Sequence, residues 1–316
     1  MGATSSLLPA DAGEDLQRLH ARFVGTRDGR AADYIPELAK VDPDAFALAV
    51  CTVEGEMLAA GDADVPFTIQ SISKPFAYGL ALDLVGREAV HRKVGVEPTG
   101  EAFNSIVELE EEVHHRPYNP MINAGAITVS ALLHEAAAAD AWTRVAGMFA
   151  AFMGHAVRQD EAVMASELAT GDRNRAIAHL LRHFGVLGDD IEGALRLYSA
   201  QCSVLVDTRD LAVMAATLAN GGVHPLTGEA ALKRDHLRDV LSLMLTCGMY
   251  DSSGEWAWSV GLPAKSGVSG GLLAVVPGRM GLAAFSPRLD ARGHSVRGVA
   301  AFKEWAPHWG LGLFGR

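Results

Sequence analysis

The sequence predicts an α+β fold, in which a five-stranded antiparallel sheet is flanked by helices and an all-helical lobe is inserted into the chain. Short apolar runs closed by Gly or Pro lie near both ends of the chain, which is typical of strands with tight connections. A helical pattern lies outside these runs at each terminus. The middle of the chain is rich in Ala and Leu, with apolar residues at i, i+3 and i+4, which indicates packed helices.

The strands of the sheet are expected to come from both ends of the chain. A helix is predicted over residues 12–26, followed by two strands within residues 46–61 that turn at Glu54-Gly55. Three more strands are predicted in the runs WSVGLPAKSG, GGLLAVVPG and MGLAAFSP, and a last helix within residues 295–309. Because the connections are short, we expect neighbouring strands to pair antiparallel, with the helices packed on the sheet.

The helical pattern fills most of residues 71–250. Its clearest stretches are residues 127–154, 174–188 and 208–222. Asp207 or Thr208 is expected to cap the last of these, and Asn220-Gly221-Gly222 to end it.

We therefore expect a single domain over residues 1–316 that has two lobes. The sheet lobe is predicted to hold residues 1–70 and 251–316, and the helical lobe residues 71–250. A cleft between two such lobes is the natural place for a small-molecule site.

Composition and charge limit the partners and the location that we expect. The formal net charge of −11 disfavours nucleic acid and anionic membrane, because both bind basic surfaces. No apolar run reaches the roughly 20 residues that span a bilayer, and the N-terminal stretch lacks the pattern of a secretory signal. Cys51, Cys202 and Cys247 are sparse and odd in number, which favours a reducing compartment. We expect a cytoplasmic protein without a metal or other cofactor.

The first motif with chemical meaning is S-x-x-K at Ser71 and Lys74, within FTIQSISKPFAYGLAL. At i, i+3 spacing on a helix the hydroxyl and the amine lie on one face, one turn apart. A lysine desolvated between two lobes can lose enough basicity to activate a serine nucleophile. The alternative is an N-capping Ser beside an exposed Lys. Pro75, which suits a first helical turn, and a second motif favour the catalytic interpretation.

The second motif is Lys265-Ser266-Gly267 followed by Val268, at the end of a predicted strand. A K-[ST]-G strand that faces an S-x-x-K helix is the arrangement of penicillin-recognising serine enzymes. The backbone N–H groups at the strand end and at the serine can together form an oxyanion hole. By itself the motif favours a polar hairpin turn, whereas its order and lobe relative to S-x-x-K favour a catalytic site.

Beyond these motifs, the sequence resembles the serine-dependent glutaminase family, whose fold is similar to that of the β-lactamases. The resemblance runs from about residue 29 to residue 298, close to the whole chain. It rests on long segments in the family order, among them FTIQSISKPF, NPMINAGAI, SELATGDRNRAIAHLL, MLTCGMYDSSGEWAW and LPAKSGVSGG.

The resemblance implies a catalytic group at three positions. Ser71 matches the family nucleophile, Lys74 its partner, and Tyr250 the tyrosine that relays a proton. A phenol suits this relay only if a nearby cation such as Lys74 lowers its pKa. Val268 matches the residue whose backbone N–H completes the oxyanion hole with that of Ser71. The implied substrate is L-glutamine, which a Ser71 acyl-enzyme would convert into L-glutamate and ammonia.

The resemblance also implies a set of residues around the amino-acid end of glutamine. Glu167 is expected to pair with the α-ammonium, because a buried cation needs a carboxylate. Donors for the α-carboxylate are expected from Asn123, Asn174, Tyr198 and Tyr34. Glu167 and Asn174 are seven residues apart and would share one face if that stretch is a helix. We expect the protein to be a homo-oligomer, a dimer or a tetramer.

Two departures from the family pattern stand at Pro75 and His294. Pro75 replaces the more usual Val after Lys74, and His294 stands where the family commonly has Asn. His294 is expected in a turn far from the motifs, so that neither change touches a proposed role.

Two other functions remain as alternatives. A β-lactamase or esterase of the same fold would share Ser71, Lys74 and Lys265 but would not need Glu167 beside Asn123 and Asn174. A catalytically silent amino-acid-binding protein would keep Glu167 and the asparagines but would tolerate the loss of Ser71.

Overall fold

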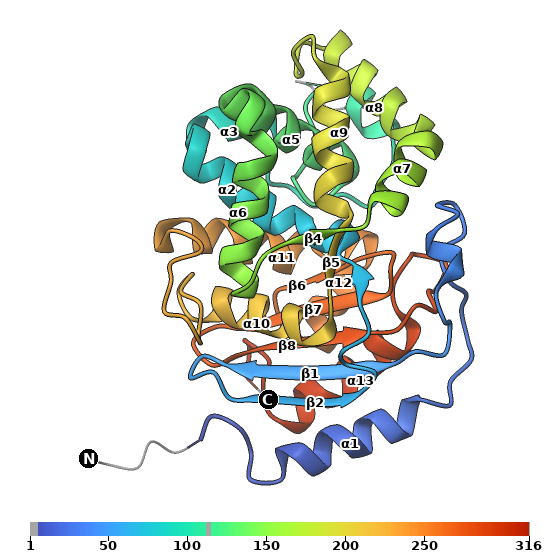
Figure 1. The fold of residues 1–316 in the computed structure, drawn as a ribbon, viewed down its shortest axis with the longest axis vertical. Helices are drawn as coiled ribbons and strands as arrows, with labels where there is room; N and C mark the ends of the chain where they lie inside the picture. Colours follow the sequence, from blue (N-terminus) through green and yellow to red (C-terminus); the bar gives the residue numbers. More distant parts are fainter. Residues whose placement is uncertain (1–5, 112–114, 316) are drawn as a thin grey trace.

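A computed structural model of the chain describes residues 6–111 and 115–315, and a five-stranded sheet lies at its centre (Figure 1). The strands are β1 (Ala47–Thr52), β2 (Met57–Gly61), β6 (Ala264–Ser266), β7 (Gly271–Val276) and β8 (Met280–Phe285). Their order across the sheet is β2-β1-β8-β7-β6, and each neighbouring pair is antiparallel. The predicted α+β fold with a five-stranded antiparallel sheet is confirmed.

The two ends of the chain meet in the middle of this sheet. β1, from the N-terminal hairpin, pairs with β8, from the C-terminal part, with Ala47 opposite Phe285 and Thr52 opposite Met280. β6, which carries Lys265 and Ser266, is the edge strand at the far side. The K-S-G motif therefore lies on an edge strand, as expected.

Both faces of the sheet are covered, and the strands alternate their side chains between two hydrophobic cores. On β1, Ala47, Ala49 and Cys51 belong to the core under the helical part, whereas Leu48 and Val50 belong to the core on the opposite face. This alternation follows from the two-residue period of a strand.

The helix α10 (Thr208–Ala219) packs directly on the sheet over β8, β1 and β7. The close approach requires Gly281 in β8, because a Cβ at this position would meet the backbone of Ala212, Ala215 and Ala216. α10 falls within residues 71–250, which we predicted as the helical lobe, yet it forms a layer on the sheet. The boundaries of the two lobes stay a prediction.

The opposite face of the sheet is covered by α1 (Ala12–Phe23) and α13 (Val296–His308), one from each end of the chain (Figure 1). The first helix ends at Phe23, three residues before the predicted end. The buried guanidinium of Arg297 in α13 donates to the carbonyl oxygens of Pro43, Asp44 and Ala45, at 2.9, 3.0 and 2.7 Å. These bonds fasten the last helix to the segment that enters β1.

The remaining helices form the upper part of the molecule and its connection to the sheet (Figure 1). They are α2 (Lys74–Val85), α3 (Arg87–Lys93), α4 (Val107–Glu111), α5 (Asn123–Ala137), α6 (Ala141–Met153), α7 (Glu161–Thr170), α8 (Asp172–His183), α9 (Ile191–Cys202), α11 (Leu237–Cys247) and α12 (Ser253–Ser259). The stretch 127–154 is two helices, α5 and α6, because the chain breaks at Ala138, whose φ is 46°. Asp207 rather than Thr208 caps α10, through a capping box with Asp210, and the helix ends at Asn220.

A second, small sheet was not predicted from the sequence. It joins β3 (Phe67–Thr68), β5 (Val204–Val206) and β4 (Arg158–Gln159) in the order β3-β5-β4. The N–H of Ile69 extends the pairing by donating to the carbonyl of Val204 at 2.8 Å. These strands are too short to leave a sequence pattern, but they fix the chain just before Ser71 against the end of α9.

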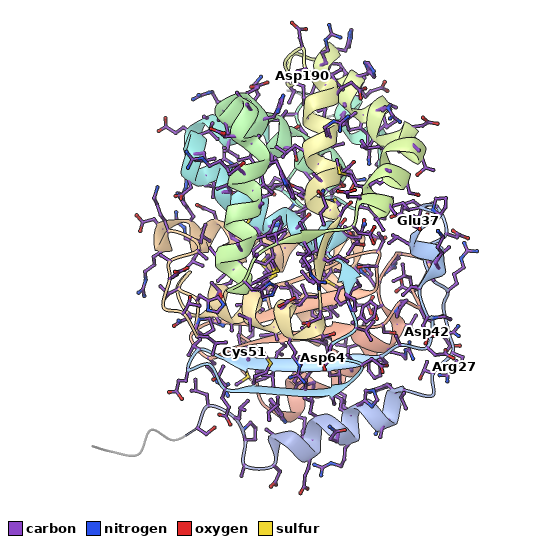
Figure 2. The ribbon with its side chains drawn as sticks, in the orientation of Figure 1. Arg27, Glu37, Asp42, Cys51, Asp64 and Asp190 are labelled. Carbon is purple, nitrogen blue, oxygen red and sulfur yellow. The ribbon has the colours of Figure 1, made fainter. Side chains whose placement is uncertain are left out.

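The cysteines lie inside the molecule, whereas several acidic side chains lie at its periphery (Figure 2). Cys51, Cys202 and Cys247 are all buried and free. Figure 2 shows Cys51 on the sheet, whereas Glu37, Asp42 and Asp190 lie at the outer edge of the molecule. Of the helices in the described part of the chain, none combines the length and the apolar character that a membrane span needs.

Candidate active site

Ser71 lies in a tight 3-10 turn, Gln70–Ser73, between β3 and the first residue of α2. The turn requires an unusual backbone at Gln70, whose φ is 51°, a left-handed conformation that costs a non-glycine residue of order 1 kcal/mol or more. Pro75 occupies the first turn of α2, as predicted. Local strain immediately before the predicted nucleophile is typical of a functional turn.

Lys74 begins α2, and its side chain is enclosed between the helical part and the sheet, with 1% of it exposed. Its Nζ donates to Asn123 Oδ1 at 2.7 Å. Burial lowers the pKa of the Lys74 ammonium to about 8, although the negative charge of Glu167 acts in the opposite direction. An appreciable minority of Lys74 is therefore neutral near physiological pH and able to accept a proton.

Tyr250 lies in the turn between α11 and α12, also with a left-handed backbone, at a φ of 51°. Its phenol O–H donates to the carbonyl of Ser266 at 3.3 Å. Burial raises the pKa of this phenol to about 12, whereas hydrogen bonding to Ser71 and Ser266 acts to lower it. The condition under which we expected a phenol to suit the relay, a pKa lowered by a nearby cation, is therefore not met. Tyr250 thus reaches Ser71 as a protonated phenol.

The end of β6 packs against the Ser71 turn. A Cβ at Gly267 would lie 3.0 Å from the carbonyl of Ile69 and 3.2 Å from Cγ1 of Ile72, on the two sides of Ser71. Glycine in the K-S-G motif therefore lets the edge strand approach the turn closely. Val268, the next residue, lines the same cavity as Ser71.

A cavity of about 320 Å³ opens at Ser71 and brings together most of the predicted site. It is lined by seven residues of the predicted binding set, namely Tyr34, Ser71, Asn123, Glu167, Asn174, Tyr198 and Val268. They come from the N-terminal loop, the Ser71 turn, α5, α7, α8, α9 and the loop after β6. Lys74 and Tyr250 do not line it, but Lys74 bonds the lining residue Asn123 and the ring of Tyr250 packs on that of the lining residue Phe103.

Asn123 is the centre of the hydrogen-bond network at this cavity. Its Oδ1 accepts from Lys74 Nζ and, at 3.3 Å, from the hydroxyl of Tyr198. Its Nδ2 donates to Asn174 Oδ1 at 3.0 Å. Asn123 thus connects the predicted catalytic lysine to the residues predicted to bind the amino-acid end of a substrate.

Glu167 has a buried carboxyl group that lines the cavity, with 7% of the residue exposed. Within the described part of the chain, its Oε2 has no hydrogen-bond partner. Burial raises the pKa of this carboxyl to about 8, and the nearby Lys74 only partly offsets the effect. An unpaired buried carboxylate is costly, so the cavity is suited to receive a cationic group at this point.

Glu167 and Asn174 reach the cavity from two helices. The helical stretch breaks at Gly171, so that Glu167 lies in α7 and Asn174 in α8. The two side chains meet at the cavity because of this bend. They do not share one face of a continuous helix, as they would if the whole stretch were helical.

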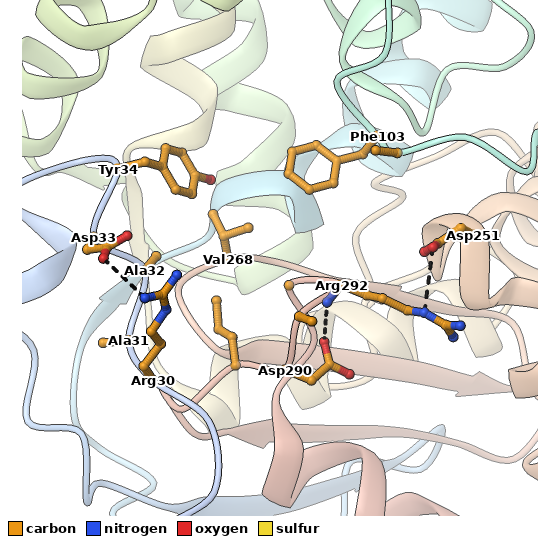
Figure 3. A pocket seen from close by; sticks show the side chains of 14 residues that line it. Arg30, Ala31, Ala32, Asp33, Tyr34, Phe103, Asp251, Val268, Asp290 and Arg292 are labelled. Carbon is orange, nitrogen blue, oxygen red and sulfur yellow. Dashed lines mark hydrogen bonds and ion pairs between the residues drawn. The ribbon is translucent and has the colours of Figure 1, made fainter.

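The outer mouth of the cavity continues into a shallower pocket of about 260 Å³ (Figure 3). Tyr34, which is 52% exposed, Phe103 and Val268 line both spaces. Figure 3 shows the rings of Tyr34 and Phe103 on the two sides of Val268. Charged residues of this pocket are paired with each other, Arg30 with Asp33 and Arg292 with Asp251. Phe103 and the cavity-lining Arg173 had no signal in the sequence.

His294 lies at the active site, and the expectation that it would be far from the motifs is wrong. Its Nδ1 is 3.0 Å from Ser266 Oγ, and its ring stacks on Tyr250 with 5.4 Å between centroids and 20° between planes. The Nζ of Lys265 lies 4.0 Å from the centroid of the same Tyr250 ring. Because these residues lie far apart along the chain, their contacts could not be predicted from the sequence.

Groups suited to a metal ion do not gather in the described residues. His179 and His183 stand one helical turn apart in α8, a spacing that metal sites use. Among residues 6–111 and 115–315, no set of three or more His, Cys, Asp or Glu side chains is arranged to hold a metal ion.

Comparison with protein families and curated proteins gives one consistent result. A family model described as Glutaminase matches residues 29–314. The chain is 55% identical over 296 residues to a glutaminase of Trichormus variabilis. The aligned region covers 94% of this chain and 88% of that protein. It is 49% identical over 290 residues to a glutaminase of Corynebacterium glutamicum. Here the aligned region covers 91% of this chain and 70% of that protein.

Solved structures with the same β-lactamase-like fold agree with the sequence comparison. One described as a probable glutaminase has a TM-score of 0.93 at 42% identity and covers 97% of this chain and 99% of its own. The probable glutaminase of Bacillus subtilis has a TM-score of 0.85 at 36% identity, and the match covers 95% of this chain and 97% of that one. A structure of Mglu in its glutamate form has a TM-score of 0.91 at 46% identity, and the match covers 97% of this chain and 70% of that one.

Proposed function

This chain belongs to the glutaminase family and is therefore an amidohydrolase, and we propose that it hydrolyses the side-chain amide of L-glutamine through an acyl-enzyme on Ser71. The observation that supports this most directly is the single cavity lined by both Ser71 and Glu167. A nucleophile and an unpaired carboxylate in one space suit a substrate with an amide at one end and an ammonium at the other.

The amino-acid end of glutamine is held by the inner part of the cavity. Glu167 pairs with the α-ammonium, and this contact provides its Oε2 with the partner that it lacks. Asn123, Asn174, Tyr198 and Tyr34 offer amide and hydroxyl donors to the α-carboxylate. The structures of Mglu in a glutamate form, at 46% identity, support a cavity of this kind for the product.

The reaction proceeds in two steps that share the same groups. Ser71 Oγ attacks the side-chain carbonyl carbon and passes its proton to neutral Lys74, so that a tetrahedral oxyanion forms under the backbone N–H groups of Ser71 and Val268. The C–N bond then breaks, and the departing nitrogen takes a proton to leave as ammonia. Water adds to the resulting ester, and the Ser71–acyl bond breaks to release L-glutamate and restore the serine.

Lys74 and Tyr250 divide the proton transfers between them. The pKa of Lys74, lowered to about 8 by burial, suits a general base at neutral pH. The phenol of Tyr250, with a pKa raised to about 12, stays protonated and is suited to donate to the leaving nitrogen while Lys74 reprotonates it. Tyr250 acts as a relay through its hydrogen bond to Ser71 and not as a phenolate.

We also propose a cytoplasmic location and a homo-oligomer of two or four subunits. The buried free state of all three cysteines supports a reducing compartment.

Ammonia release from purified protein tests the proposed activity. We expect turnover of L-glutamine and much weaker turnover of N-acetyl-L-glutamine, because the neutral amide of the latter would leave the Glu167 carboxylate unpaired. L-Asparagine and D-glutamine in the same assay define the depth and the handedness of the cavity. Hydrolysis of nitrocefin without ammonia release from glutamine would contradict the proposal and favour a β-lactamase activity. Equal efficiency on glutamine and its N-acetyl derivative would contradict the role of Glu167.

A further inference from the structure

His294 is buried in the segment between β8 and α13, where its backbone is fixed at both ends. Its N–H donates to Asp290 Oδ1 at 3.0 Å, and its carbonyl accepts from the N–H of Asp290 at 2.8 Å. The turn is closed by Gly293, whose φ of 84° suits glycine. The side chain therefore extends from a loop that is held by backbone hydrogen bonds, and only 2% of the residue is exposed.

The imidazole makes two contacts, and both involve residues of the proposed active site. Nδ1 is 3.0 Å from Ser266 Oγ in the K-S-G strand, and the ring stacks on Tyr250. Ser266 also bonds to two other residues of the site, because its carbonyl accepts from the Tyr250 hydroxyl at 3.3 Å and from Lys265 Nζ at 2.8 Å. His294 therefore contacts Tyr250 directly through its ring and indirectly through Ser266.

Tyr250 needs such support because its own backbone does not favour its position. Its φ of 51° is strained for a tyrosine, and a strained conformation persists only where the surroundings fix it. The Phe103 ring centroid lies 4.8 Å from that of Tyr250, and Lys265 Nζ and Lys74 Nζ lie 4.0 and 6.0 Å from it, so that His294 is one of four groups around the ring.

The charge state of His294 suits a fixed structural contact. Burial lowers its pKa to about 4, with Lys265 and Arg292 acting in the same direction and Asp290 and Asp251 in the opposite one. The ring is therefore neutral at physiological pH and carries one N–H. Among the described residues, Nε2 has no hydrogen-bond partner. An unpaired buried N–H is rarer than an unpaired acceptor, which places the proton on Nδ1, where it is donated to Ser266 Oγ.

We propose, on the basis of the Ser71 hydrolysis described above, that His294 is a positioning residue of this reaction. Its Nδ1–H holds Ser266, and its ring holds the phenol of Tyr250 against Ser71. Neither contact reaches the amino-acid end of the substrate. Loss of His294 should therefore lower kcat and leave KM for glutamine nearly unchanged.

Three substitutions separate the two contacts. His294→Asn keeps a donor near the place of Nδ1 but has no ring, and His294→Phe keeps a ring but has no donor. His294→Ala has neither. We expect kcat to fall roughly tenfold in each of the first two variants, which is about what one lost hydrogen bond or ring contact costs, and further in the third. KM should stay within about twofold of the wild type, since catalysis and not uniform binding is affected.

His224→Asn provides the matched control. His224 is also 2% exposed and accepts from the N–H groups of Leu226 and Thr227, in a turn that carries none of the proposed site residues. Its loss should leave kcat unchanged. Calorimetric titration with L-glutamate counts the competent sites in every preparation, so that kcat refers to folded protein.

Three results would overturn the role of His294. These are an unchanged kcat in all three variants, a change confined to KM, or an equal loss of kcat in the His224→Asn control. Failure of the proposed function has a different signature, because the wild type and the control would then release no ammonia from glutamine.

Discussion

Glu167 has a buried carboxyl group whose Oε2 finds no hydrogen-bond partner among the described residues, and this arrangement favours ligand binding over stability. Since burial raises its pKa to about 8, the folded protein keeps the group protonated over a range where the unfolded chain ionises it. The group therefore contributes stability at low pH that is lost as the pH rises from the unfolded pKa, 4.5, toward 8.

Glu167→Gln should stabilise the free enzyme and weaken its binding of glutamine. At pH 7 the gain in unfolding free energy is on the order of 3 kcal/mol, and it should disappear below about pH 4.5, where both states are protonated. The loss of the ion pair with the α-ammonium should cost about 2 to 5 kcal/mol of binding. Urea denaturation over a range of pH and calorimetric titration with L-glutamate measure the two effects. A variant that is less stable and binds equally well would contradict this account of Glu167.

In the proposed mechanism Lys74 and Glu167 must each lose a proton before the free enzyme binds and attacks glutamine, and burial brings the pKa of each group to about 8. Because two protons are lost, we expect kcat/KM to rise with pH by up to about a hundredfold per unit well below pH 8 and to level off above it. Lys74→Met should lower kcat strongly, with a much smaller change in KM. Initial rates of ammonia release across this range measure the profile. A flat or falling profile between pH 6 and 8, or a Lys74→Met variant impaired only in KM, would contradict the role of Lys74.

Single residues of the site differ in how far the sequence could identify them. Ser71, Lys74 and Lys265 belong to short motifs with a chemical meaning, whereas Glu167 was identified only through the family resemblance, since an acidic residue on a helix is usually solvated. His294 was misjudged because its contacts are to Tyr250 and Ser266, which lie far from it along the chain. A single sequence carries no signal for such contacts.

At the scale of elements, the start of α5 sets the position of Asn123. Gly125 in the first turn of this helix lies against the carbonyl of Asn119, and a Cβ there would collide with the backbone of residues 119 and 120. That backbone cannot move freely, because the buried Asn119 side chain bonds the carbonyl of Glu97 and the N–H of Met121, at 2.8 and 2.9 Å. The site depends on a close contact between a helix and the turn before it.

Gly125→Ala should displace Asn123 and reduce activity, although alanine favours a helix. We expect kcat/KM to fall by about tenfold or more, because displacement of Asn123 disturbs its bonds with Lys74, Tyr198 and Asn174 together. Gly147→Ala in α6 is the matched control, since a Cβ there meets nothing within 4 Å. The control should keep full activity and gain about 0.5 to 1 kcal/mol of stability. Equal activity of the two variants would refute this role of the α5 start.

The elements themselves were predictable where they carry a strong period, and less so at their breaks. The five strands and both terminal helices have clear patterns and were found. The break at Ala138 was missed because alanine favours a helix, and the break at Gly171 was missed although glycine commonly ends one. The small sheet of β3, β5 and β4 has strands of two or three residues, which no sequence pattern can reveal.

At the scale of the whole molecule, the sheet and the helices share one core. Buried side chains of β1, β7 and β8 pack in the same cluster as those of α2, α6 and α10. α5 extends this continuity, because Val129 belongs to this cluster and Ile127 to the neighbouring one under α8 and α9. A continuous core predicts that the parts do not unfold separately.

We expect calorimetry to show one unfolding transition, with a calorimetric enthalpy equal to the van't Hoff enthalpy. L-Glutamate should raise Tm without splitting the transition, because the cavity proposed to bind it joins residues from both parts of the molecule. Two separate transitions, with only one sensitive to L-glutamate, would contradict a shared core and favour independent lobes.

The central claim is that Ser71 is the nucleophile and not a binding residue. The measurement that tests it most directly is ammonia release from L-glutamine by Ser71→Ala, with binding of L-glutamine to the same preparation followed by calorimetry. We predict that kcat falls by several orders of magnitude while binding stays measurable, because Ser71 acts on the amide and Glu167, Asn123 and Asn174 hold the other end. Ammonia release near the wild-type rate from a variant that still binds glutamine would contradict the serine mechanism.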